Sequence, residues 1–123
     1  MKIILVSIIL LFTSHAHAHA QWETWTDDEQ RMFVASNIAI VADWATTRDI
    51  SQRYHEGYYE KNIILGLYPS RDRVDLYFIG LLVGNYYLVD YSDKYRFYYL
   101  TFRTAVHGHA AVNNVTLGLR LRF

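Results

Sequence analysis

The chain has 123 residues, enough for one domain, and its 12 basic and 12 acidic residues give a formal net charge of zero. This balance excludes the basic surface that nucleic acids require, so no nucleic-acid partner is expected. The sequence contains no cysteine, which excludes disulfide bonds, cysteine nucleophiles and cysteine-based metal sites.

Residues 1–20 are predicted to be a signal peptide. Lys2 provides a positive start, residues 3–12 form an apolar core, and two Ala-His-Ala sequences, ending at Ala18 and Ala20, offer cleavage sites. The apolar core is short for a membrane anchor, which needs about 20 apolar residues. Export to the cell envelope is therefore expected.

The remaining residues, 21–123, are expected to form one helical domain. Its start is marked by Thr26 and Glu29, which have the spacing of a capping box ahead of a long apolar run. The predicted elements are helices at about 27–50, 70–91 and 94–112, followed by a tail at 115–123.

The second predicted helix contains Gly80 and Gly84 in a small-xxx-small pattern. Such pairs let helix backbones approach closely in lipid, whereas each glycine costs about 1 kcal/mol against alanine in a water-soluble helix. The glycine face is expected to pack across the seam between the first and third helices.

The tail alternates, with apolar residues at every second position from Leu117 to Phe123 and with Arg120 and Arg122 between them. A period of two is typical of a strand whose faces differ. A short β-like C-terminal tail is therefore predicted, either lying on a membrane or pairing with another chain.

The distribution of basic residues favours membrane helices. Five basic residues lie from Arg48 to Arg73, in the loop between the first two helices, and the positive-inside rule places such a loop in the cytoplasm. The predicted fold class is an all-α, three-helix transmembrane bundle in the bacterial inner membrane. Its expected partners are the lipid bilayer and either a second copy or another membrane protein. A periplasmic bundle and an outer-membrane-associated protein stay open as alternatives.

Part of the chain resembles a group of small, uncharacterised proteins from bacteria and their phages, which have a signal-like start and predicted membrane helices. The resemblance rests on four short patterns: Asp43-Trp44-x-x-Thr47-Arg48, Glu60-x-Asn62-x-x-Leu65-Gly66, Pro69-Ser70 and Tyr77-Phe78. Ile63 stands where such proteins usually have a proline after the asparagine. The resemblance implies a membrane architecture and no assigned activity.

The candidate site centres on Asp43, a carboxylate within the first apolar run, where a charge needs a partner. Arg103 and His107 lie one turn apart on one face of the third helix, so Asp43 is predicted to pair with this face. The candidate polar site comprises Asp43, Thr47, Arg48, Glu60, Asn62, Arg103 and His107. Neither a metal site nor a cofactor is predicted, because His107 and His109 point apart on a helix and no H-E-x-x-H spacing exists.

Three functions fit these features. The preferred one is a non-enzymatic envelope protein that contacts other envelope or phage proteins through its helices. The second is a minimal membrane hydrolase or transferase using Asp43, Glu60 and His107. The third is a periplasmic or outer-membrane-associated binding protein that pairs through its C-terminal strand. No nucleophile elbow or phosphate-binding loop is present in the sequence, which is why the first is preferred.

Overall fold

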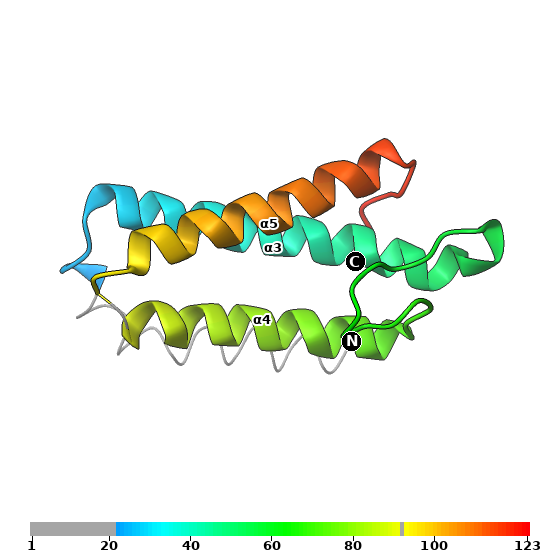
Figure 1. Cartoon of the computed structure of the whole chain (residues 1–123), viewed down its shortest axis with the longest axis horizontal. Coiled ribbons are helices and arrows are strands. Elements are labelled where there is room, and N and C mark those ends of the chain that lie inside the picture. The colour runs from blue at the N-terminus through cyan, green and yellow to red at the C-terminus, as the bar shows by residue number, and fades with distance from the viewer. Residues whose placement is uncertain (1–21, 92) are drawn as a thin grey trace.

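Three long helices form an up-down-up arrangement in the computed structural model, which describes residues 22–91 and 93–123 (Figure 1). The helices are α3 (Asp27–Arg53), α4 (Arg71–Tyr91) and α5 (Arg96–Thr116), and a short 3₁₀ helix, η1 (Tyr54–Glu56), follows α3. Helix α5 runs parallel to α3, and α4 runs antiparallel to both. The signal peptide predicted at residues 1–20 lies outside the described residues.

The start of α3 is fixed by the capping box expected from the sequence. The Glu29 N–H donates to Thr26 Oγ1 at 3.3 Å, and the Thr26 N–H donates to Glu29 Oε2 at 2.8 Å. These bonds satisfy two donors that a helix start leaves free. At the other end, Gly57 has a φ of 91°, which only glycine adopts without strain, and the chain turns away after η1.

Two apolar clusters hold the helices together, one toward each end of the bundle. The first cluster joins Ile40 of α3, Leu65 of the loop, and Val74 and Phe78 of α4. The second cluster is formed by Trp25, Val89 and Leu100. Phe78 is almost fully buried and is the largest side chain of the first cluster.

Between these clusters the contact of α3 with α4 is polar. The side-chain amide of Asn85 donates to Ser36 Oγ at 3.1 Å and to Asn37 Oδ1 at 3.2 Å. Asn85 and Ser36 are fully buried. A buried amide is stable only when it is hydrogen-bonded, so this contact fixes the register of α4 on α3.

The glycine face of α4 does not pack where the sequence predicts. A Cβ atom built on Gly80 or Gly84 meets no described atom within 4 Å. The side of α4 that packs against α3 carries Val74, Phe78 and Asn85 instead. The predicted packing of Gly80 and Gly84 across the seam of the other helices is therefore wrong.

The transmembrane prediction is also wrong. Across residues 22–91 and 93–123, the length and apolar character that a membrane crossing demands are not combined in any helix. The reason lies in the polar residues that interrupt each apolar run, such as Ser36 and Asp43 in α3 and Asn85 in α4. The membrane character assigned to the bundle from its sequence is withdrawn.

The β-like tail is the third correction, because no strand is present in the described part of the chain. Helix α5 continues four residues past its predicted end, and the segment after it lies against α3. The backbone N–H of Arg122 donates to the Ala45 carbonyl at 3.1 Å, and that of Arg120 donates to Asp49 Oδ2 at 2.9 Å. These N–H groups are bonded to a helix, so the tail forms no sheet.

Replacing Phe78 with alanine tests the core. Loss of a buried phenylalanine typically costs about 3–5 kcal/mol, since contacts are lost and a cavity remains. Phe78→Ala should lower the free energy of unfolding in urea by this amount. Phe123→Ala, at an exposed phenylalanine, is the matched control and should change it by less than about 0.5 kcal/mol. Equal effects of the two variants would contradict the described core.

Candidate functional site

The centre of the candidate site is a buried contact between Asp43 of α3 and His107 of α5. Asp43 Oδ2 lies 2.7 Å from His107 Nδ1, and Thr47 Oγ1 donates to Asp43 Oδ1 at 3.3 Å. Asp43 is 7% exposed and His107 5% exposed. The pairing of Asp43 with His107 that the sequence predicts is therefore present.

Helix geometry explains why these side chains meet. Asp43 and Thr47 are four residues apart on α3 and therefore lie on one face. The residue before Thr47 also contacts α5: Thr46 Oγ1 accepts a hydrogen bond from the Asn114 side-chain amide at 3.0 Å. Because α3 and α5 run in the same direction, the contact that lies further along α3 also lies further along α5 (Figure 1). The polar side chains thus fix the register of α5 on α3.

The imidazole of His107 has two distinct nitrogen atoms. Nδ1 is the nitrogen that faces the Asp43 carboxylate. Nε2 is buried and has no hydrogen-bond partner among the described atoms. The ring packs edge-on against Phe78, with 6.3 Å between ring centroids. Nε2 of His107 therefore lies inside the bundle beside Phe78, without a hydrogen bond to the described residues.

Glu60 and Asn62 lie in the loop that covers this region. Glu60 Oε1 accepts from the Asn62 N–H at 2.8 Å, and the Asn62 amide donates to the Tyr77 hydroxyl at 2.8 Å. Burial raises the pKa of Glu60, the Asn62 N–H opposes this effect, and the charge of Asp43 raises the pKa further. Asp43 and Glu60 are thus close enough to influence each other electrostatically. Asn62 ties the loop to α4.

Arg48 belongs to a different contact. Its Nε lies 3.1 Å from Asp75 Oδ1 of α4, and the Trp44 indole N–H donates to the same oxygen at 2.8 Å. Arg48 is buried, and Asp75 is largely so. The Asp75 carboxylate therefore joins α4 to α3 through one hydrogen bond and one ion pair, which is a structural role.

Arg103 does not pair with Asp43, so that part of the sequence prediction is wrong. Its guanidinium carbon lies 6.0 Å from the Tyr99 ring centroid. No carboxylate of the described residues is within ion-pair distance of it, and its Nε has no hydrogen-bond partner there. Asp43 is instead bonded by His107 and Thr47, and Arg103 lies beside Tyr99 on its own helix.

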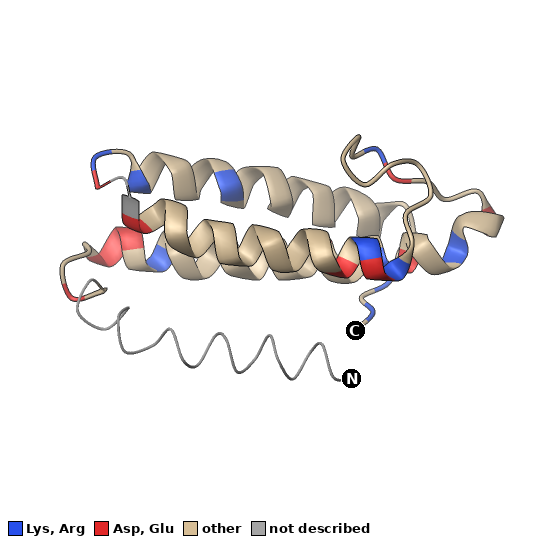
Figure 2. Cartoon of the chain, turned by 90° about the horizontal axis from the view of Figure 1, so that it is seen from below, with Lys and Arg blue, Asp and Glu red and all other residues tan. Residues whose placement is uncertain are grey.

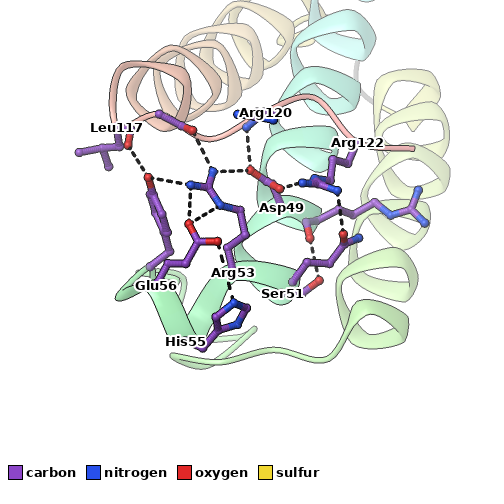
Figure 3. A network of polar contacts seen from close by, with 12 residues as sticks. Asp49, Ser51, Arg53, His55, Glu56, Leu117, Arg120 and Arg122 are labelled. Carbon is purple, nitrogen blue, oxygen red and sulfur yellow. Dashed lines mark hydrogen bonds and ion pairs between the residues drawn. The ribbon is translucent and has the colours of Figure 1, made fainter.

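A second polar network, around Asp49, was not predicted. The fully buried Asp49 accepts hydrogen bonds from Arg53 Nη1 at 3.1 Å, from the Arg120 N–H at 2.9 Å and from Arg122 Nε (Figure 3). Burial raises the pKa of Asp49, but these three donors outweigh it and hold the pKa below its usual range. Two features of the sequence could have indicated this network: Asp49 and Arg53 are one helical turn apart, and the tail contains two arginines with no acidic residue near them in the sequence.

The Asp49 network, made of Asp49, Arg53, Arg120 and Arg122, fastens the tail to α3. Arg53 Nη1 also donates to the Gly118 carbonyl at 3.0 Å, and its Nη2 donates to Glu56 Oε2 at 2.6 Å. One arginine therefore links α3, η1 and the tail, as Figure 3 shows.

The described residues contain no group of three or more His, Asp or Glu side chains placed to hold a metal ion. No family model matches the chain, and neither a curated protein nor a solved structure is similar to it. The arguments about function therefore rest on the geometry of this chain alone.

A double-mutant cycle tests the Asp43–His107 contact. Asp43→Leu or His107→Leu strands one polar group in the interior and should cost about 3–5 kcal/mol of unfolding free energy. The double variant strands neither partner of the pair, so its cost should fall below the sum by about 0.5–3 kcal/mol. Urea unfolding measures all three values.

The exposed pair Asp28–Arg31, at 3.7 Å, is the matched control for this cycle. Leucine substitutions at its two positions should be additive, because exposed ion pairs contribute little. Strict additivity at Asp43 and His107 as well would show that the buried contact carries no coupling energy.

Glu60 gives a pH-dependent prediction. Its pKa in the folded chain is raised above the unfolded value, so its stabilising contribution is complete at low pH and is lost as pH rises through the folded pKa. Glu60→Gln stays neutral and avoids this loss. Its Tm relative to the parent chain should therefore increase between pH 4 and pH 7, values chosen around the ordinary glutamate pKa of about 4.3.

Glu56→Gln is the control of opposite sign. The hydrogen bond from Arg53 lowers the pKa of Glu56, so its contribution is present at neutral pH and lost on acidification. The Tm of this variant relative to the parent should fall between pH 4 and pH 7. The same pH trend for both variants would contradict the environments described for the two carboxyl groups.

Proposed function

We propose that the protein is a non-enzymatic binding protein of the cell envelope, which acts by contacting another protein through apolar faces of α4 and α5. The cell envelope is proposed because residues 1–20 have the pattern of a signal peptide. The binding role is proposed because large apolar side chains lie on the surface while polar side chains are paired in the interior.

The middle of the bundle is almost without charge. No acidic or basic residue occurs from Leu76 to Val89 in α4 or from Thr104 to Leu119 in α5 and its C-terminal turn. Charged residues gather toward the two ends of the bundle (Figure 2). On α5, Arg103 is the one charged residue after Arg96. Water-exposed helix faces normally carry charged residues, so this middle zone is suited to contact with another surface.

Large apolar side chains are exposed in this zone of α4, and on α5 they are exposed both in the zone and in the turns just before it. On α4, Leu76 is 74% exposed and Tyr87 is 67% exposed. On α5, Tyr98, Phe102 and Val112 are 71%, 65% and 67% exposed. Single exposed apolar residues are ordinary, but rows of them on neighbouring turns mark interaction sites. This is the observation that carries the proposal.

The buried polar residues support the same conclusion. Ser36, Asp43 and Asp49 bond other elements of the chain. They fix helix register, and they lie out of reach of a binding partner. Recognition by an apolar helix face also needs no cofactor, and helix-in-groove contacts are a common form of it.

A hydrolase or transferase using Asp43, Glu60 and His107 is the second candidate. It is favoured by the raised pKa of Glu60 near Asp43 and by the unpaired, buried Nε2 of His107 within the described region. Such pairs of titratable groups occur at catalytic sites. However, a catalytic base must reach its substrate to about 3 Å, and Asp43 and His107 are enclosed between helices. The binding function is preferred for this reason.

Photo-crosslinking in cells tests the binding function. A photoreactive amino acid replacing Leu76 on α4 should give an adduct with one protein, and Tyr87→Glu on the same face should reduce its yield about tenfold, the effect of about 1.4 kcal/mol in binding. A photoreactive residue at Tyr54, exposed near the charged end, is the matched control and should not give this adduct. Adducts with lipid alone, or the same products from both positions, would contradict the proposal.

A further inference from the structure

The outward face of α5 carries an apolar stripe. Tyr98, Phe102 and Val106 follow one another at intervals of four residues, Val112 lies six residues further on, and all four are exposed. The exposed His109 lies between the two valines. Opposite them, Leu100, His107 and Ala111 are buried against the rest of the bundle. Between Thr104 and Leu119 the only titratable side chains are two histidines. Helix α5, with 21 residues, carries no carboxylate and no lysine, and its fully charged residues are Arg96 and Arg103.

The two ends of the bundle that flank this stripe differ in charge. Residues 22–31 and 90–96 meet at the end where α5 begins, and they hold six acidic and three basic residues. Residues 48–75 and 117–123 meet at the opposite end, and they hold five acidic and seven basic residues. The molecule thus has an acidic end and a basic end, joined by the uncharged middle zone.

We propose that a second copy of this chain covers the α5 face, with the two α5 helices antiparallel about a two-fold axis at the level of residue 107. Residues equally distant from that level then face each other across the axis. Phe102 lies opposite Val112 of the second copy, and Ala105 lies opposite His109 of the second copy. The aromatic side chains near the start of α5 meet the small and β-branched ones near its end.

Charge complementarity selects a second copy with this direction. In the antiparallel arrangement the acidic end of each copy meets the basic end of the other. A parallel pair would place like ends together, which costs free energy. A two-fold pair satisfies both ends at once, because the same contact occurs twice.

The apolar area available on α5 indicates how stable the proposed dimer should be. Aromatic side chains offer about 150–250 Å² each, so the exposed parts of Tyr98 and Phe102 with the two valines amount to about 400 Å² per copy. A stable interface buries about 800 Å² per partner, and the charged ends contribute the rest. The dimer is therefore expected at micromolar concentration and should dissociate on dilution.

This inference rests on the proposed function and divides its two faces: the α5 face binds a second copy of the chain, and the α4 face binds a different protein. The two can fail separately. Loss of dimerisation is read on α5 variants of the purified chain, whereas loss of partner binding is read on α4 variants in cells.

The first experiment measures mass by sedimentation at about 1–100 μM, the range in which a small interface associates. The protein is purified from cells expressing the full chain. The parent should be a dimer at the upper concentrations, and salt should weaken it because its ends are charged. Phe102→Glu should weaken dimerisation at least a hundredfold, whereas Tyr87→Glu on α4 should leave it unchanged. Circular dichroism of both variants checks that the helices are intact.

The second experiment tests direction, and it is clean because the chain has no cysteine. A mixture of Phe102→Cys and Val112→Cys should form a disulfide between the two variants, and neither variant should do so alone. A parent that stays monomeric, a Phe102→Glu variant that still dimerises, or efficient crosslinking of Phe102→Cys with itself would overturn the inference. Recruitment of a monomer to phosphatidylcholine vesicles through Phe102 would also overturn it, in favour of a lipid surface.

Discussion

The fold depends on the polar side chains that α3 brings into the interior. Ser36, Asp43, Thr46 and Asp49 are all buried, and a buried polar group is costly unless it is hydrogen-bonded. Each is bonded by a part of the chain outside α3. Asn85 of α4 bonds Ser36, α5 bonds Asp43 and Thr46, and the C-terminal tail bonds Asp49. The apolar clusters supply the driving force for collapse, and these bonds determine where along α3 each element comes to rest.

The same constraint explains the surface. Because polar residues occupy the inner sides of the helices, apolar residues such as Leu76 of α4 and Phe102 of α5 are left on the outside. A chain that obeyed the usual pattern would place such residues in its core. Their exposure is therefore a consequence of how the interior is built, and it is the basis on which we propose contact with another protein. Function and fold are linked through α3.

The sequence predicted the contact that follows from the free-energy cost of placing a charge in an apolar run. A carboxylate in an apolar run demands a partner, which led from Asp43 to His107. The prediction from sequence was wrong where one residue pattern is compatible with two different structures. Alternating leucines and arginines suit a strand, yet they equally suit an extended segment whose backbone and arginines bind a buried carboxylate, here Asp49. Its position could not be found from spacing, because Arg120 and Arg122 are about 70 residues away in the chain. The glycines of α4 allow close helix packing but do not require it. The apolar runs were interpreted as membrane spans although polar residues interrupt them.

Cysteine labelling in cells tests the central claim most directly: the polar interior leaves an apolar middle zone that other proteins cover. Single cysteines can replace Val83 in the middle of α4, Val112 in α5, and Gln52, which is exposed near the basic end. Cysteines in the middle zone should react with a water-soluble maleimide at least about tenfold more slowly than that at position 52, a protection equivalent to about 1.4 kcal/mol. All three should react alike after unfolding. Equal rates in the native protein would show that the middle zone is bare and would contradict the account.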